Sequence, residues 1–447
     1  MNRLARNLEK LKSLFSKKAA ILIEQAEKGT LAQSPWSLTW RRFRKRRLAL
    51  WSWRVLLVLA VVALLADFLA NEKPLYCKLG GQSYFPIFKQ YGVDLGFAKW
   101  DTVFLKKNWI ELPYEAVVFP PIPYSSSSLD LKNNNYRSPF GQQNLQSWRW
   151  RHWLGTDQAG RDVAAGMVAG TRVALLVGII SMGIATVIGL LLGSLAGYFG
   201  DDRMRVSWLG LGLNLLALFF AWFYGFKARG FTLSEAAKNG GLGWELLKSL
   251  AIVALVFLVA NGLSALVNRF VRIRKITLPL DLIIMRGIEM MNAIPGLLLL
   301  LALVAVLEKS SIFYVMAIIG LLRWTSIARY LRAEMLKIRN LGYIEAARAM
   351  AFPDRRILWR HALPNALGPV LITLAFGVAA AILMESTLSF LGIGGGTEGL
   401  TWGSLLKLAR GNPSAWWLAI FPGAAIFVTV TIFNLIGDGL GEAMGER

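Results

Sequence analysis

Long apolar runs alternate with polar, basic segments along most of this chain. A transmembrane helix needs roughly 20 consecutive apolar residues to cross a bilayer. Runs of about that length occur at 49–70, 173–197, 208–226, 250–267, 283–307, 312–331, 366–391 and 415–437. Composition agrees, because 55% hydrophobic residues and a mean hydropathy of +0.47 are too apolar for an ordinary soluble domain. The pattern predicts an all-α polytopic membrane protein with about eight transmembrane helices.

Basic residues beside these runs indicate the orientation in the membrane. Six of the seven residues 41–47 are basic, and they come directly before the first run. By the positive-inside rule, this places 1–48 in the cytosol as a basic segment, 49–70 as the first transmembrane helix and 71–168 outside as a periplasmic loop. Eight crossings then return the tail 439–447 to the cytosol.

The first 30 residues differ from a cleaved signal peptide, because charges interrupt every apolar stretch. Leu4, Leu8, Leu11 and Phe15 recur at helical spacing, with basic residues between them. This spacing predicts a basic amphipathic helix on the inner leaflet. A disordered basic tail is the alternative.

Charge and composition exclude several kinds of function. The net charge of +23 is concentrated beside apolar runs and forms no aromatic-interleaved patch, so we expect membrane lipid and no nucleic acid as a partner. Cys77 is the only cysteine, and His152 and His361 are the only histidines, which excludes an intrachain disulfide and a Cys- or His-rich metal centre. No segment has the Gly-x-x-x-x-Gly-Lys-Ser/Thr pattern of a phosphate-binding loop, so we expect no nucleotide or other cofactor on this chain.

A polar, basic segment at 341–365 separates the sixth and seventh runs and falls on the cytosolic side of the predicted topology. Its first half contains good helix formers, and Pro353-Asp354 then breaks the helix. A second short helix can begin at Arg355. Two short helices at an angle would form a knob that can dock into a partner.

This segment resembles the EAA loop of permease subunits of bacterial type I ABC importers. Glu345, Ala346, Ala347, Leu363 and Pro364 match the pattern of that loop. The resemblance implies that Glu345 meets basic residues of an ATPase and that the two alanines permit close packing. Arg348 and His361 flank the same surface.

The glycine of the pattern is replaced by Ala351. Since alanine reaches a left-handed conformation only at an energetic cost, we expect the bend to have moved to Phe352-Pro353-Asp354.

The predicted external loop contains a second motif at 152–162. It includes Gly155-Thr156-Asp157 and Gly160-Arg161-Asp162. The motif resembles the segment before the second helix in C-type permeases of dipeptide, oligopeptide and nickel importers. Further matches to that group lie at 285–296, 384–392, 402–403 and 416–439. The long loop around Tyr84-Phe85-Pro86 is similar to the subgroup that handles larger peptides, including peptide antibiotics.

Two interpretations of the second motif remain open. Its glycines and aspartates are typical of turns in which Asp accepts backbone hydrogen bonds. The family resemblance instead implies an external face on which a solute-binding protein docks.

The resemblance implies a permease transmembrane domain at 169–438 that differs from its relatives by an insertion. The family core has six helices, and 206–270 adds a predicted helical hairpin in place of a short cytosolic link. A cytosolic helical domain is the alternative for this insertion. The family further implies a second permease, two ATPase subunits that bind ATP and Mg²⁺, and an external solute-binding protein, all at a bacterial inner membrane.

Charged residues at membrane depth are costly and usually face protein or a water-filled path. Arg286 and Glu289 are one turn apart and can pair. Glu289 and Glu385 are candidates for the transport pathway, with helix packing as the alternative for Glu385.

The resemblance implies that this chain is a permease subunit of an ATP-driven importer. Together with a second permease it would form the path for peptides or a related small solute. A secondary transporter or another polytopic membrane protein without an ATPase is the alternative. A secondary transporter would show two matching halves with paired broken helices, and this sequence shows no internal repeat.

Overall fold

The computed structural model describes residues 35–100, 104, 109–110, 112–145, 147–239, 242–271, 273–306, 311–393 and 400–445. The amphipathic helix expected in the first 30 residues lies outside these ranges. The chain divides into two compact units, which are described separately. The first contains the described residues up to Ile188, together with Ile294–Ile327 and Leu367 onward. The second contains Gly189–Ala293 and Ala328–Ala366.

Within the described residues, seven helices are long and apolar enough to cross a membrane. They are α3 (Arg47–Leu64), α6 (Val163–Phe199), α7 (Trp208–Trp222) with its π-helical continuation to Lys227, α9 (Leu242–Phe270), α12 (Ile312–Ile338), α15 (Leu363–Phe390) and α17 (Trp417–Gly445). An eighth is α10 (Leu280–Ala293) with α11 (Gly296–Ala305), if the pair counts as one broken span. The predicted all-α polytopic fold is confirmed.

Proline explains the break in that eighth span. Pro295 stands directly before α11, and a proline disfavours helical backbone at the residue before it. Helix α10 therefore ends at Ala293.

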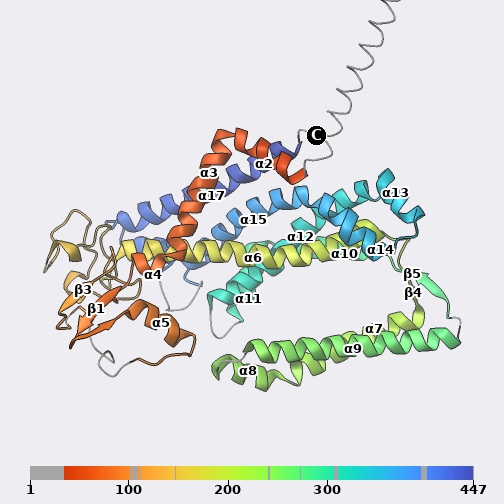
Figure 1. Ribbon diagram of the computed structural model, residues 1–447, viewed down its shortest axis with the longest axis horizontal. Helices are drawn as coiled ribbons and strands as arrows, with labels where there is room; N and C mark the ends of the chain where they lie inside the picture. Colours follow the sequence, from red (N-terminus) through yellow and green to blue (C-terminus); the bar gives the residue numbers. More distant parts are fainter. Residues whose placement is uncertain are drawn as a thin grey trace, which may run out of the picture. The chain divides into compact units, whose positions relative to one another are not determined.

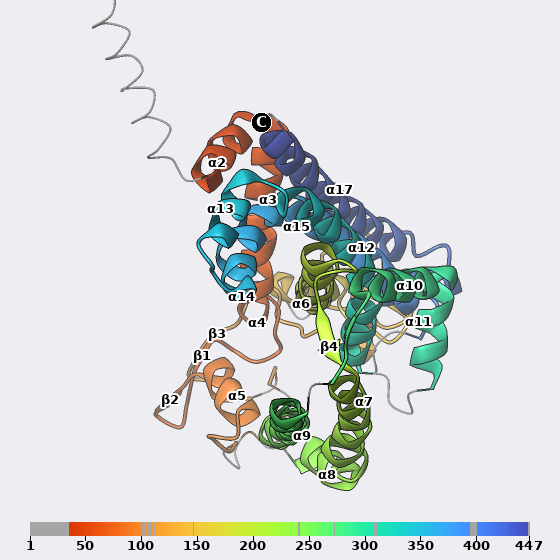
Figure 2. The same ribbon diagram turned by 90° about the vertical axis from the view of Figure 1, so that its right-hand side faces the viewer.

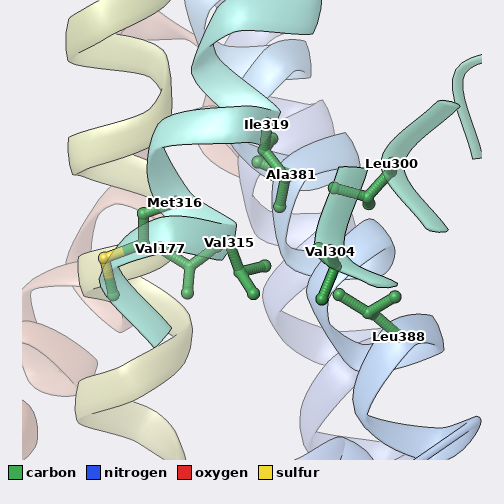
Figure 3. Packing of buried hydrophobic residues seen from close by; sticks show 8 residues of the cluster. All are labelled: Val177, Leu300, Val304, Val315, Met316, Ile319, Ala381 and Leu388. Atoms are coloured by element: carbon green, nitrogen blue, oxygen red, sulfur yellow. The ribbon is translucent and has the colours of Figure 1, made fainter. Parts of the chain in front are cut away.

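The main core of the first unit lies where α6, α11, α12 and α15 meet (Figure 3). It consists of Val177, Leu300, Val304, Val315, Met316, Ile319, Ala381 and Leu388. A Cβ on Gly320 would lie 2.7 Å from the carbonyl oxygen of Ser181, so α6 and α12 approach at backbone distance there. Small residues permit such close crossings in membrane bundles.

A second cluster in this unit joins α2 (Pro35–Lys45), α3 and α17, which lie together in Figure 2. Phe43 and Ala49 pack against Ile432 and Ile436. A Cβ on Gly439 would lie 2.4 Å from the Cβ of Ala49, so this glycine lets α17 approach α3 closely.

A small antiparallel sheet, which was not predicted from the sequence, follows the first span. Its strands are β1 (Tyr76–Leu79), β2 (Gln82–Tyr84) and β3 (Ala116–Val118), in the order β2-β1-β3. Gly80 and Gly81, with φ of 59° and 77°, form the two-residue turn between β1 and β2. A two-residue hairpin with positive φ at both positions favours glycine.

Shorter elements complete the first unit. They are α4 (Ala66–Leu69), α5 (Pro86–Asp94), the 3₁₀ turns η2 (Leu131–Asn133) and η3 (Trp148–Trp150), and α16 (Trp402–Gly411). Helix α16 begins with a capping box made by Thr401 and Ser404.

The second unit contains the inserted hairpin, in which α7 and α9 lie side by side and α8 (Gly230–Asn239) lies at one end (Figure 1). Strands β4 (Arg205–Ser207) and β5 (Lys275–Thr277) pair antiparallel at the base of the hairpin. The side chains of Asn214 and Asn261 exchange hydrogen bonds of 3.2 Å between the two long helices. The insertion is therefore a helical hairpin, as predicted.

Candidate functional site

The segment 341–365, which was predicted to be cytosolic, begins with α13 (Gly342–Ala349), a helix with one buried and one exposed face. Ile344 and Ala347 are buried, whereas Glu345 and Ala346 are exposed. Glu345 lies in the first turn, where the helix dipole stabilises a carboxylate. Ala347 therefore serves internal packing, and Glu345 with Ala346 remains available to a partner.

The bend after α13 lies at Ala351, and the expected relocation to Phe352-Pro353-Asp354 is wrong. Ala351 has φ of 57°, in the left-handed region. The amide of Ala351 donates to the carbonyl of Arg348, and the amide of Phe352 donates to that of Ala347. These two bonds form the usual left-handed helix ending, and they hold alanine in a conformation that favours glycine.

Pro353 has a different role from the one expected. It precedes α14 (Asp354–Ile357), which continues through a π-helical turn, Leu358–Ala362, into α15. The second half of the loop is thus the beginning of a long helix and not a separate short one. Leu363 is buried and Pro364 is exposed within this continuous helix.

Aromatic and basic side chains cover the outer face of this second half. Pro353, Arg355, Arg356 and Trp359 line a surface hollow of about 400 Å³. The guanidinium of Arg356 lies 4.5 Å from the centre of the Phe352 ring, and His361 stacks on the same ring at 6.4 Å. The hollow is therefore basic and partly aromatic.

The end of α6 holds α14 in place within the same unit. The hydroxyl of Tyr198 donates a hydrogen bond of 2.7 Å to Asp354, and the Tyr198 side chain is fully buried. Tyr198 was not among the predicted site residues, because its partner is far away in the sequence.

Replacing Ala351 by glycine should stabilise the loop, because glycine adopts the left-handed conformation without the steric penalty of a Cβ. The penalty is about 1 kcal/mol, so we expect a small rise in the unfolding midpoint of the Ala351→Gly protein. Thermal unfolding of the purified protein measures it. A matched Ala349→Gly variant, inside α13, should be destabilised instead. A lower midpoint for Ala351→Gly would contradict the assigned conformation.

The second motif of the sequence analysis is a buried turn in the first unit. Oδ1 of Asp157 accepts hydrogen bonds from the amides of Ala159 and Arg161, at 2.8 and 2.9 Å. Asp162 accepts from the amide of Ala165 at 2.7 Å, at the start of α6. Both carboxylates are buried, so the interpretation as backbone-binding aspartates is confirmed.

Two glycines make this turn feasible. Gly155 and Gly160 have φ of 79° and 85°. A Cβ on Gly160 would lie 2.1 Å from the carbonyl oxygen of Asp130. Thr156 is buried, and its carbonyl accepts from the indole of Trp417. Only Arg161, which pairs with Asp157, offers part of a charged side chain to a docking protein.

A buried histidine, to which no role was assigned from the sequence, joins this turn to the preceding loop. Nδ1 of His152 lies 2.8 Å from Asp162 Oδ2, and Nε2 lies 3.2 Å from Asp130 Oδ2. The His152 ring is fully buried and stacks on Tyr124. Burial favours the neutral ring, but the hydrogen bonds and charges of Asp162 and Asp130 outweigh it and raise the pKa of His152.

The two acidic residues proposed for the transport pathway differ in their surroundings. Glu385 is buried in α15 and accepts a hydrogen bond of 2.7 Å from Ser389, one turn along the same helix. Glu385 therefore has a hydrogen-bond partner on its own helix. Glu289 is exposed and pairs with Arg286 at 2.7 Å, as anticipated.

Two family models match this chain, one near its N-terminus and one over its C-terminal part. The family model described as the binding-protein-dependent transport system inner membrane component matches residues 263–447, which include the loop around Glu345. The model of the N-terminal transmembrane domain of oligopeptide transport permease C matches residues 34–85.

Individual relatives extend the similarity over most of the chain. The inner membrane ABC transporter permease protein YejE of Escherichia coli K12 is 27% identical over 409 residues, covering 90% of this chain and 95% of the relative. The glutathione transport system permease protein GsiD of Pectobacterium atrosepticum is 30% identical over 297 residues, covering 66% of this chain and 73% of the relative. The chain belongs to the ABC transporter permease family. It is a multi-pass inner-membrane subunit of a transporter complex. The peptidoglycan transport system permease YejE of Agrobacterium fabrum is 24% identical over 432 residues, 91% of this permease and 92% of the relative.

Proposed function

We propose that this permease forms, with a second permease, the path by which an external binding protein delivers peptides or a related small solute, driven by two ATPases. The observation that carries the proposal is the exposed face of the segment 341–365. Glu345 and Ala346 are exposed on α13, and the second half of the segment carries the basic hollow. ATP and Mg²⁺ would be bound by the ATPases.

The names of several relatives favour peptides as the substrate class. A putative peptide permease protein of Brucella suis biovar 1 is 27% identical over 73% of this chain. Other relatives are named for peptidoglycan and glutathione transport, and both of these compounds contain peptide or peptide-like bonds. We therefore propose that the substrate of this permease is a compound with peptide bonds.

Coupling would use the helical connection between the loop and α15. Helix α14 runs through the π-helical turn directly into α15, so a displacement of the hollow is transmitted along one continuous helix. Tyr198 and Asp354 tie the same region to the end of α6. Closure of an ATPase dimer would then move α6 and α15 together and alternate the access to the path.

Charge reversal at Glu345 tests this assignment. An exposed carboxylate on a basic surface is expected to meet a cation of the ATPase, so Glu345→Lys should weaken co-purification of the ATPase several-fold and leave membrane insertion intact. Glu235→Lys, on the exposed surface of α8, is the matched control. Equal recovery of the ATPase with both variants would remove Glu345 from the coupling surface.

The orientation of the inserted hairpin follows from its charges. The base of the hairpin carries Arg203, Arg205, Arg269, Arg274 and Lys275. By the positive-inside rule the base lies in the cytosol, as would both termini, and 227–249 lies outside.

Labelling with a membrane-impermeant thiol reagent measures this orientation. In a Cys77→Ser background, a cysteine replacing Asn239 should react in intact cells, because it lies outside. A cysteine replacing the exposed Gly342 should react only after permeabilisation. Protection of position 239 in intact cells would place the hairpin tip in the cytosol.

A further inference from the structure

Three arginines converge on the end of α6 in the second unit. The guanidinium of Arg348 lies 5.6 Å, and that of Arg203 6.0 Å, from the centre of the buried Tyr198 ring. Nη1 of Arg339 would be 2.8 Å from a Cβ on Gly200, directly after α6. Gly200 has φ of 61°, so glycine there allows both the turn and the approach of Arg339.

Arg203 is exposed, whereas Arg339 and Arg348 are partly buried, and each of these two has one buried N–H group without a partner. Nε of Arg339 and Nη2 of Arg348 are buried without a hydrogen-bond partner. Nη1 of Arg339 donates to the carbonyl of Gly197 at 3.4 Å, a long bond. None of the three forms an ion pair with a carboxylate of the described residues. Buried polar groups are usually satisfied, so the unpaired N–H groups point to a ligand.

The excess of positive charge around the end of α6 also points to an anionic ligand. Arg203 interacts with the positive charges of Arg348 and Arg339 and with the carboxylate of Asp354, and the end of α6 supplies roughly half a negative charge. The pKa of Arg203 is lowered first by burial and then by the positive charges of Arg348 and Arg339. An additional anion would relieve this repulsion.

The helix length indicates where in the membrane the cluster lies. Helix α6 has 37 residues, and at about 1.5 Å per residue it exceeds the bilayer, which is roughly 40–45 Å thick with its headgroups. Its end at Phe199 is joined through Tyr198 and Asp354 to the segment 341–365, which is too polar for the hydrocarbon layer. The cluster therefore lies at the headgroup layer or just beyond it.

We propose that Arg203, Arg339 and Arg348 form a binding site for a phosphate group. The planar fork of a guanidinium matches two phosphate oxygens, and three guanidinium groups near the end of α6 suit a phosphate better than a single carboxylate. The phosphate belongs to an anionic phospholipid of the inner leaflet or to free inorganic phosphate. Bound there, it fixes α13 to the end of α6. The site rests on the proposed cytosolic placement of the loop and is independent of the transported substrate.

The test uses the complete transporter complex. Complexes with the wild-type chain, Arg348→Gln, or Arg203→Gln with Arg348→Gln are purified and placed in nanodiscs of phosphatidylcholine, with or without phosphatidylglycerol. Bound lipids are counted by native mass spectrometry, and unfolding midpoints are measured with and without inorganic phosphate. Arg355→Gln, in the exposed hollow, is the control. Size-exclusion chromatography verifies that every variant is folded.

The two sources give different results. If the ligand is a lipid, wild type and Arg355→Gln retain phosphatidylglycerol, and the Arg348→Gln complex binds it roughly tenfold more weakly, equivalent to losing one charge-assisted hydrogen bond. Arg348→Lys recovers part of the binding. If the ligand is free phosphate, phosphate raises the midpoint of wild type in phosphatidylcholine alone, and this rise is lost in the double variant.

Equal lipid retention and equal phosphate response in wild type and both arginine variants overturn the proposal. Loss of the ATPase from Arg348→Gln, with lipid and phosphate binding unchanged, also overturns it and assigns a carboxylate of the ATPase to the arginines. Loss of the ATPase from Glu345→Lys with lipid retention intact leaves the phosphate site in place, so the two proposals fail separately.

Discussion

Leucine in place of Gly193 is expected to prevent the chain from folding stably in the membrane. A Cβ at this position would lie 2.6 Å from the carbonyl oxygen and 2.9 Å from the Cα of Ala328 in α12. One turn on, a Cβ at Gly197 would lie 2.5 Å from the Cβ of Met335. The two glycines form a Gly-x-x-x-Gly contact at which α6 and α12 meet at backbone distance. Backbone cannot be displaced as a flexible side chain can, so the helices would have to separate.

The cost of Gly193→Leu should exceed the 1–3 kcal/mol that is typical of inserting extra methylenes into a packed core. Gly183→Leu is the matched control, because a Cβ there meets no atom within 4 Å. The measurement is the amount of folded, membrane-inserted protein and its unfolding midpoint. Similar behaviour of the two variants would show that α6 and α12 do not meet at Gly193.

Removing His152 should destabilise the segment that contains Tyr124, Asp130 and the turn at 155–162 by about 3 kcal/mol, because breaking a buried ion pair leaves an uncompensated charge. In His152→Ala, the buried carboxylate of Asp162 loses its partner at 2.8 Å, and Asp130 loses one at 3.2 Å. The cavity left beside Tyr124 adds to this cost. Unfolding of the purified protein, followed by tryptophan fluorescence, measures the loss. His152→Gln, which keeps a polar group of similar size, should lose less.

The same group makes stability depend on pH. Because the pKa of His152 is raised above its unfolded value of about 6.5, its contribution is complete below that pH and is lost as the pH rises through the folded pKa. Burial opposes ionisation of Asp130, but hydrogen bonds from Asn133 and His152 outweigh it and lower its pKa. That contribution is complete above about pH 3.9 and is lost as the pH falls through the folded value.

The segment should therefore be most stable at mildly acidic pH, and stability should decline toward alkaline pH. In His152→Ala the alkaline decline should disappear. An unchanged alkaline decline in His152→Ala would contradict the assigned charge on the histidine.

The sequence was sufficient to predict the spans, because eight apolar runs of bilayer length have few alternative structures. It also located the segment around Glu345, since polar residues between two spans must lie outside the hydrocarbon. The bend at Ala351 was mispredicted, because a steric penalty of about 1 kcal/mol is smaller than what the two backbone hydrogen bonds and the buried Ile344 and Ala347 contribute. The preference of alanine for a negative φ was therefore outweighed by the hydrogen bonds that end α13.

Other features depend on contacts that no local pattern contains. Tyr198 and Asp354 are far apart in the sequence, as are His152 and Asp130, so their pairing could not be deduced from spacing. Gly193 and Gly197 are a further case, because they permit a close approach of α12 and the sequence does not show which backbone lies next to them. The turn at Gly80-Gly81 is the exception: adjacent glycines between alternating residues are a hairpin signal that was present and overlooked.

The central claim is that this permease transports a peptide substrate only when its segment 341–365 engages an ATPase. Its most direct test is uptake of labelled peptides into proteoliposomes that contain this chain, the second permease, the ATPases and the binding protein. We expect uptake that requires ATP, persists with Glu235→Lys and falls several-fold with Glu345→Lys. Uptake that proceeds without ATP and is driven by an ion gradient, equally in wild type and Glu345→Lys, would contradict the account.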